Sequence, residues 1–268
     1  MGAVPDLKKV KLIFMGTPDF AVPSLEALIA AGCNITAVIT QPDRPKGRGR
    51  RDAPSPVKEA AERHAISPVL QPERVRDEKF LAEFFSLAPD VVALVAFGQI
   101  LPREMLEFPK YGIVNVHPSL LPKYRGAAPI NWALIRGETE TGVTTMRIGE
   151  GVDSGDILLQ EKVLIAPEED HGSLSARLAA LGAQLLVKTL EGLVSGNVEA
   201  IPQDHSRATF APRLRKEDGQ IKWDSRPQDI VNLVRGLSPS PAAYSFLQGK
   251  QLKVFSAKAL PGSPDGSP

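Results

Sequence analysis

Two short segments, residues 90–97 and 112–117, constrain the fold more than any other feature of the sequence. Their sequences are DVVALVAF and GIVNVH, and both are almost entirely apolar. A continuous apolar run of this length is typical of a β-strand that is buried on both faces. Such strands occur in parallel sheets that helices cover, so the sequence predicts an α/β fold.

The rest of the first half alternates between strand-like and helix-like segments. The apolar pattern predicts further strands at residues 11–15, 34–40 and 67–71. Helical spacing of apolar residues predicts helices at 20–32, 56–65, 77–88 and 172–196. Strand-like segments at 142–148 and 156–165 are separated by only a short loop, which predicts an antiparallel pair.

Charge and cysteine content restrict the class of protein. The chain has 268 residues and a formal net charge of +1, so a nucleic-acid partner would have to be bound by local basic patches. The single cysteine, Cys33, excludes an intramolecular disulfide and a cysteine-built zinc site, and it fits a reducing compartment. No apolar run looks long enough to span a bilayer, and the N-terminus has no signal-peptide pattern. We therefore expect a cytoplasmic protein without a membrane partner.

Asn115 and His117 lie where an apolar strand gives way to a loop, in the sequence NVHPSLLPKYRGAAPINWAL. Ligands of open parallel sheets bind beyond the carboxyl ends of the strands. Residues two apart on a strand point to the same side. A histidine can move protons near neutral pH, and an asparagine amide can donate to a developing oxyanion, so the pair suits addition to a carbonyl. From spacing alone, a structural interpretation also stays open, in which Asn115 caps a turn and His117 fills a polar corner.

Asp153 lies in a glycine-containing loop between the two antiparallel segments, in the sequence EGVDSGDI. Gly151 and Gly155 permit backbone angles that let such a loop approach a ligand closely. A carboxylate near His117 would fix the tautomer of the imidazole and favour its protonated form. An ordinary turn without any catalytic role has the same pattern.

Residues 41–51, QPDRPKGRGRR, are rich in basic side chains and almost free of apolar ones. Such a segment cannot pack into a core. It is either a solvated loop or a contact for a polyanion, and composition leaves both possibilities open.

Taken together, these motifs closely resemble the 10-formyltetrahydrofolate-dependent formyltransferases. The N-x-H, S-L-L-P and D-x-G-D elements occur in the order and spacing of that family, and similarity extends over nearly the whole chain through IFMGTPDFAVPSLEALIAAG, SPVKEAA and IVNLVRGLSPSPAAY. The resemblance implies a Rossmann-like, mostly parallel sheet with helices on both faces. It also implies a catalytic domain at residues 1–203 and, at 204–268, a linker with a smaller OB-like β domain. Fewer strands follow Trp223 than such a barrel needs, so we expect that domain to be incomplete.

The same resemblance implies direct formyl transfer from 10-formyltetrahydrofolate, without a metal. The implied catalytic residues are Asn115, His117 and Asp153. The implied donor-binding residues are Ser119, Leu120, Leu121, Pro122, Phe97, Gly98 and Gln99. The basic segment resembles the branch of the family whose acceptor is methionyl initiator tRNA, with Arg44, Lys46, Arg48, Arg50 and Arg51 as the implied tRNA contacts.

Three functions remain distinguishable at this point. The first is formylation of methionyl initiator tRNA, by a protein that we expect to be a monomer. The second is formylation of a small amine such as an amino sugar nucleotide, which would not need a basic loop. The third is folate binding without transfer, which would not need the Asn115, His117 and Asp153 set.

Overall fold

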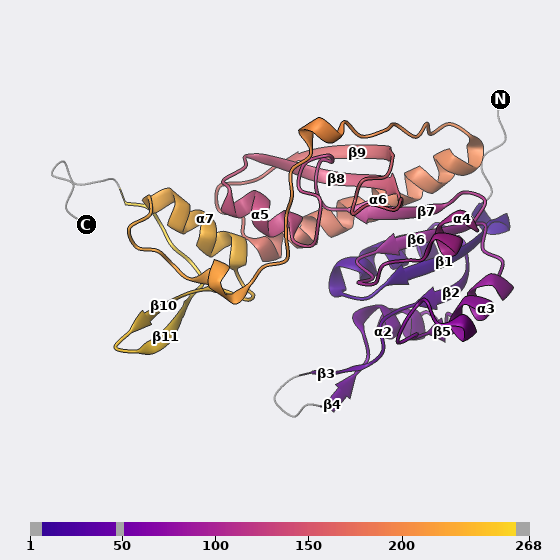
Figure 1. The fold of residues 1–268 in the computed structure, drawn as a ribbon, viewed down its shortest axis with the longest axis horizontal. Coiled ribbons are helices and arrows are strands. Elements are labelled where there is room, and N and C mark those ends of the chain that lie inside the picture. The colour runs from indigo at the N-terminus through magenta and orange to yellow at the C-terminus, as the bar shows by residue number, and fades with distance from the viewer. Residues whose placement is uncertain (1–6, 47–50, 261–268) are drawn as a thin grey trace.

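A seven-stranded sheet forms the centre of the computed structural model, which describes residues 7–46 and 51–260 (Figure 1). Its strand order is β5-β2-β1-β6-β7-β8-β9. The strands are β1 (Lys11–Gly16), β2 (Asn34–Ile39), β5 (Val69–Leu70), β6 (Val91–Val95), β7 (Ile113–His117), β8 (Glu140–Arg147) and β9 (Ile157–Leu164). The first five in spatial order pair in parallel, whereas β8 and β9 pair antiparallel. The predicted mostly parallel sheet and its antiparallel pair are therefore confirmed.

Helices cover both faces of this sheet, as predicted. One face packs against α1 (Val22–Ala30), α2 (Pro56–Arg63) and α6 (His171–Ser195), and the other packs against α3 (Glu78–Ser86) and α4 (Arg103–Glu107). Because side chains alternate along a strand, Phe14 of β1 joins the first core while its neighbours Ile13 and Met15 join the second. This double burial explains why the strand segments are continuously apolar.

The helix ends follow local sequence signals. The Ser55 side chain caps the start of α2 by accepting a hydrogen bond from the Lys58 backbone N–H. Asp170 forms a capping box with Ser173 at the start of α6. Asp77 occupies the cap position of α3, but its side chain makes no capping bond. Gly32, with a φ of +70°, ends α1 in the left-handed conformation that favours glycine.

A smaller unit follows α6 and lies at one end of the molecule (Figure 1). It contains α7 (Pro227–Leu237) and a hairpin of β10 (Ala243–Leu247) and β11 (Lys250–Val254). Its small core centres on Ile221, Val234, Leu237 and Ala243, and α7 packs against α5 (Pro129–Ile135) of the main unit. Short 3-10 helices complete the described chain at η1 (Leu7–Lys9), η2 (Asp19–Ala21), η3 (His205–Arg207) and η4 (Lys216–Gly219). The division at residue 203 stays a prediction.

Two features differ from the expectation. The basic segment 41–51 contributes to an antiparallel hairpin of β3 (Arg44–Lys46) and β4 (Arg51–Ala53), which projects from the sheet (Figure 1). In addition, α6 is long and apolar enough by length and composition to cross a membrane. Half of that apolar stretch is buried, and its leucines pack on α1 and the sheet, so core packing accounts for its composition.

Candidate active site

Asn115 and His117 lie in the last three residues of β7, where the strand reaches the carboxyl edge of the sheet. They are 8% and 4% exposed. Both belong to the same side of the strand as Ile113, which packs in the core under α3 and α4. The parity of a single buried strand thus brings the amide and the imidazole to one side of the sheet edge, as predicted.

Hydrogen-bond acceptors face both nitrogens of the His117 ring. Nε2 lies 2.9 Å from the carbonyl oxygen of Tyr124, and Nδ1 lies 3.6 Å from Oδ2 of Asp153. Since a carbonyl can only accept, Nε2 carries a proton and donates it. A proton on Nδ1 would face the Asp153 carboxylate, so each ring nitrogen has an oxygen acceptor beside it.

The side chain of Tyr124, whose carbonyl accepts from His117, is itself held by two contacts. The phenol of Tyr124 donates a 2.6 Å hydrogen bond to Glu138, and the Arg136 guanidinium lies 5.2 Å from the ring centroid. Burial, together with the bond to Glu138, raises the pKa of Tyr124 to about 12. The phenol therefore stays protonated and keeps its bond across the neutral pH range.

Asp153 is presented by the loop between β8 and β9 in a strained conformation. Its φ is +46°, a value that non-glycine residues rarely adopt. Its Oδ2 accepts a 2.8 Å hydrogen bond from the Gly126 backbone N–H and also faces His117. Strain of this kind typically costs about 1–3 kcal/mol and persists where surrounding contacts impose it.

A cavity of about 430 Å³ opens beside these residues. Both Asn115 and Asp153 line it, and its walls also include Leu94, Leu101, Leu106, Met146 and Ile148. Within the described part of the chain, no hydrogen bond engages the Asn115 carboxamide, although the residue is almost completely buried. Its amide atoms are open to the cavity rather than sealed in the core, so they are free to bind a group inside it. Apolar walls with a few convergent polar groups are typical of small-molecule sites.

Of the predicted donor-binding residues after β6, only Gln99 lines this cavity. Its Oε1 accepts from the Val75 backbone N–H at 3.0 Å, which ties the cavity wall to the loop before α3. The Phe97 side chain packs in the core, and its carbonyl accepts from Thr17 Oγ1 and from Gln41 Nε2, each at 3.2 Å. Gly98 has a φ of +89° and turns the chain between them.

The segment 119–122 lies outside the residues that line the cavity. Ser119 Oγ donates to the Lys123 carbonyl at 2.7 Å, and the Leu121 backbone bonds to Thr144 Oγ1 and to Gln160 Nε2. Polar side chains of β8 and β9 therefore hold the backbone of this loop in place. Contact of Ser119, Leu120, Leu121 or Pro122 with a donor stays a prediction.

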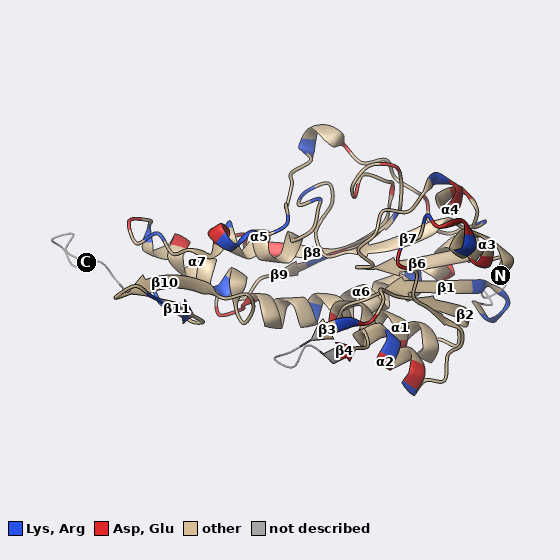
Figure 2. Ribbon diagram, turned by 60° about the horizontal axis from the view of Figure 1, so that its bottom comes forward, with Lys and Arg blue, Asp and Glu red and all other residues tan. Residues whose placement is uncertain are grey.

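The basic hairpin is anchored to the main unit by a polar cluster at its base. Lys58 Nζ of α2 lies 2.8 Å from Asp43 Oδ2 and 2.9 Å from Gln71 Oε1, while Gln71 Nε2 donates to Asp43 Oδ1 at 2.7 Å. Arg44 is exposed and lies 3.7 Å from Glu73. Arg48, Arg50 and the side chains of Lys46 and Arg51 lie outside the described residues, so their predicted role in tRNA binding is untested. In Figure 2, Lys and Arg are coloured blue, and blue is visible on the part of this hairpin that the structure describes.

Sequence reasoning missed the residues that support Asp153, because they are distant in sequence. The buried side chains of Arg125 and Gln203 meet behind the Asp153 loop, 78 residues apart in the chain. Gln203 is the last residue of the expected catalytic domain, just before the expected linker. No spacing signal connects it to Asp153.

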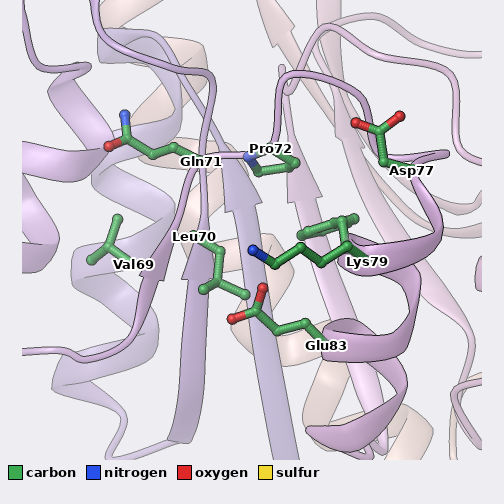
Figure 3. Close-up of a pocket in the computed structure, with 8 residues that line it drawn as sticks. Val69, Leu70, Gln71, Pro72, Asp77, Lys79 and Glu83 are labelled. Carbon is green, nitrogen blue, oxygen red and sulfur yellow. The ribbon is translucent and has the colours of Figure 1, made fainter.

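A second cavity of about 300 Å³ lies between β5 and α3 (Figure 3). It is lined by Val69, Leu70, Gln71, Pro72, Asp77, Lys79, Phe80 and Glu83. None of the predicted catalytic residues borders it. Among residues 7–46 and 51–260, no group of three or more histidine, cysteine or acidic side chains is clustered to hold a metal ion.

Family models and relatives of known sequence agree on one family for this chain. A family model described as formyl transferase matches residues 8–190, and a second, described as the formyl transferase C-terminal domain, matches residues 213–268. The methionyl-tRNA formyltransferase of Syntrophus aciditrophicus (strain SB) is 53% identical over 262 residues, which cover 98% of this chain and 84% of the relative. The methionyl-tRNA formyltransferase of Geotalea uraniireducens (strain Rf4) is 52% identical over 259 residues, covering 97% and 82% of the two chains.

Solved structures support the fold independently. The N-formyltransferase from Helicobacter canadensis, solved with folinic acid and dTDP-3-aminofucose, superposes with a TM-score of 0.71 at 21% identity. The match covers 92% of this chain and 87% of that one. At this level of identity the likeness concerns the fold.

Proposed function

The chain belongs to the formyl transferase family, and on that premise we propose that it transfers the formyl group of 10-formyltetrahydrofolate to the α-amine of methionyl initiator tRNA. Relatives that are more than half identical over nearly the full chain carry the name methionyl-tRNA formyltransferase. The observation that carries the proposal is the unpaired carboxamide of Asn115, which borders the same cavity as Asp153, the partner of His117.

Each of the three catalytic residues has a distinct role in this proposal. The Asn115 amide donates to the formyl oxygen, where negative charge develops as the amine attacks the carbonyl carbon. His117 accepts a proton from the attacking amine at Nδ1 and returns it to the departing nitrogen. Asp153 stabilises the imidazolium that exists between these two transfers, because its carboxylate faces Nδ1. The Tyr124 carbonyl holds the other nitrogen in its donating tautomer throughout.

The donor occupies the 430 Å³ cavity in this proposal. Its volume falls within the range of about 300–1,000 Å³ that is usual for small-molecule sites. Leu101, Met146 and Ile148 offer apolar contact to a flat ring, and Asn115 offers the polar group that fixes its orientation. When bound there, the folate supplies the activated formyl group. We propose that Gln99 and its neighbours Phe97 and Gly98 shape the entrance, and that Ser119–Pro122 hold the opposite loop in place.

The acceptor side supplies positive charge at two places. One is the β3–β4 hairpin, with Arg44, Lys46, Arg48, Arg50 and Arg51 as proposed phosphate contacts. The other is the segment after α6, where exposed Arg207, Arg213, Arg215 and Lys216 flank the exposed ring of Phe210. Basic side chains interleaved with an aromatic ring suit an RNA strand, through phosphate contacts and base stacking. A small amine needs neither surface.

A small-amine acceptor remains the second candidate, because sugar N-formyltransferases share the fold. We also propose that the protein works as a monomer in the cytoplasm. Gel filtration with light scattering tests the first point, and fractionation of the source cells tests the second.

The experiment that separates the two acceptors measures formylation against salt for wild type and Arg48→Ala. A guanidinium grips a phosphate through two parallel charge-assisted bonds, so we expect kcat/KM for charged initiator tRNA to fall about 10–100-fold. The dissociation constant for the donor should stay within about two-fold of wild type. Arg63→Ala is the matched control, since Arg63 is an exposed arginine on α2 whose described partner is Glu26.

A triple variant that neutralises Lys46, Arg50 and Arg51 should flatten the salt dependence of tRNA binding. Each lost phosphate contact removes about 0.7–0.9 from the slope of log K against log salt concentration. Formylation by the hairpin variants that equals wild type at every salt concentration contradicts the tRNA proposal. Turnover of an amino sugar nucleotide without turnover of charged tRNA would establish the alternative.

A further inference from the structure

A buried side-chain network lies behind the Asp153 loop and connects it to the segment after α6. Arg125 and Gln203 are 5% and 6% exposed, and neither carries a role in the proposed chemistry. We propose that Gln203, oriented by Arg125, is a positioning residue that holds Asp153 against His117 during formyl transfer. The inference rests on the proposed function for its kinetic consequence, but its structural consequence can be measured without any substrate.

The amide of Gln203 bonds to the catalytic loop through its nitrogen. Nε2 donates to the carbonyl oxygens of Asp153 and Gly155, at 2.9 and 2.6 Å. These bonds hold the loop backbone at Asp153 itself and two residues beyond it. Because Asp153 has a φ of +46°, an unbraced loop would gain free energy by relaxing. Gln203 therefore opposes that relaxation.

Arg125 determines which way the Gln203 amide points. Its Nε and Nη2 donate to Gln203 Oε1 at 3.0 and 2.6 Å. A guanidinium has only donors and a carbonyl can only accept, so the amide oxygen faces Arg125 and the amide nitrogen faces the loop. The reverse orientation would set donor against donor and acceptor against acceptor. Nη2 also lies 3.1 Å from Nδ1 of His205, which must accept this bond.

The backbone beside Arg125 contacts both catalytic side chains directly. The carbonyl of Tyr124, one residue before, accepts from His117, and the N–H of Gly126, one residue after, donates to Asp153. The Arg125 backbone is itself fixed, since its N–H donates to the Thr209 carbonyl at 2.9 Å. A three-residue segment thus positions the imidazole, the carboxylate and, through Gln203, the loop that carries the carboxylate.

The charge of Arg125 suggests that the network serves more than stability. Within the described part of the chain, no carboxylate forms an ion pair with this nearly buried guanidinium. A buried cation with neutral partners is costly, and an apolar side chain would be a cheaper structural filler. A displacement of about 1 Å at a reacting group can cost about 10²-fold in rate. Accurate placement of Asp153 gives this costly arrangement a function.

The test uses Gln203→Leu, which keeps the side-chain volume nearly constant and removes all four hydrogen bonds. We expect kcat to fall about 10–100-fold, while the donor dissociation constant stays within about two-fold. In an Asp153→Asn background, the same change should lower kcat by less than about two-fold, because the placed carboxylate is already absent. Independent losses that multiply in the double variant would show that Gln203 acts as a general structural support and would overturn the proposal.

Hydrogen exchange of the Gly126 amide provides a readout that needs no acceptor. Its protection should decrease at least about ten-fold in Gln203→Leu, since the Asp153 carboxylate that accepts its proton is released. Asn131→Ala is the control, because Asn131 is another buried amide that bonds a backbone carbonyl, that of Gly236, away from this loop. It should leave Gly126 exchange unchanged.

Unchanged Gly126 exchange in Gln203→Leu overturns the inference even if kcat falls. Conversely, a wild type that fails to formylate charged tRNA refutes the proposed acceptor and leaves the exchange result to decide the role of Gln203. The two failures are therefore distinguishable.

Discussion

Substituting Asn115 with alanine should separate activity from stability. The carboxamide forms no hydrogen bond within the described chain, and the side chain borders a cavity. Its removal therefore leaves no protein hydrogen-bonding group unpaired. We expect the free energy of unfolding to change by less than about 1 kcal/mol.

The catalytic rate should respond very differently. Loss of a single preorganised oxyanion donor typically lowers kcat by about 10²–10³-fold, equivalent to about 2.7–4 kcal/mol of transition-state stabilisation. The assay is single-turnover formylation of charged initiator tRNA with saturating donor, which isolates the chemical step from product release. Urea unfolding of the same preparations gives the stability.

Asn131→Ala is the matched control for this experiment. Both asparagines are 8% exposed, but Asn131 Nδ2 donates a 2.8 Å hydrogen bond to the Gly236 carbonyl. Truncation leaves that buried carbonyl unpaired, which should destabilise the fold by about 1–3 kcal/mol. Its kcat should stay within about two-fold of wild type. A near-normal kcat for Asn115→Ala, or a loss of stability as large as that of Asn131→Ala, would refute the assignment of Asn115 as the oxyanion donor.

Three further outcomes can be measured directly. The hydrogen bond from Lys58 lowers the pKa of Asp43, so its stabilising contribution is present above the ordinary value of 3.8 and disappears as the pH falls through the lowered folded value. Lys58→Met should therefore reduce stability at neutral pH, and urea unfolding should show the difference from wild type shrinking as the pH falls below 3.8. Burial raises the pKa of the Cys33 thiol to about 11, so the native thiol should be alkylated more slowly than the unfolded one at pH ~8, and equal rates would contradict this. The folded protein should also lose stability as the pH rises from about 9 towards 11, because the thiol then ionises more readily in the unfolded chain. A Cβ on Gly155 would overlap the Arg147 carbonyl oxygen, so Gly155→Ala should displace the catalytic loop and lower kcat by at least about ten-fold, and unaltered kinetics would show that the loop adapts.

The central sheet was predictable because its strands are buried on both faces. Strand β6 is buried along its whole length, and such a segment has no competing solvent-exposed arrangement. The hairpin of β3 and β4 was not predictable from its sequence. Its polar, glycine-rich residues lack strand periodicity, and its base is held by Lys58 and Gln71, which lie further along the chain. Helix α4 is only five residues long, too short for a helical period to be visible.

The candidate site divides in the same way between local and distant determinants. Asn115 and His117 were predictable because a strand of known parity carries them to one side of the sheet edge. Asp153 was assigned through its family motif, and the structure brings it within 3.6 Å of His117. The contributions of Arg125 and Gln203 depend on a contact between segments 78 residues apart, which no local pattern encodes. Distance in sequence, rather than weakness of the interaction, is what hid them.

The strand order gives a physical reason for two separate substrate approaches. The order reverses between β1 and β6, where ligands of open parallel sheets usually bind, yet the cavity that Asn115 borders lies along β6, β7 and β8. The segment that leads from β2 into the basic hairpin lies at the reversal point, because Gln41 of this segment and Thr17, which follows β1, both donate to the Phe97 carbonyl after β6. Gln99, two residues after Phe97, lines the cavity proposed for the donor. The loop after β6 therefore contacts the segment that leads into the basic hairpin on one side and borders the proposed donor cavity on the other, so a movement of either would reach the same few residues. On this geometry we expect the two substrates to bind cooperatively, and a donor dissociation constant that is unaffected by saturating tRNA would contradict that coupling.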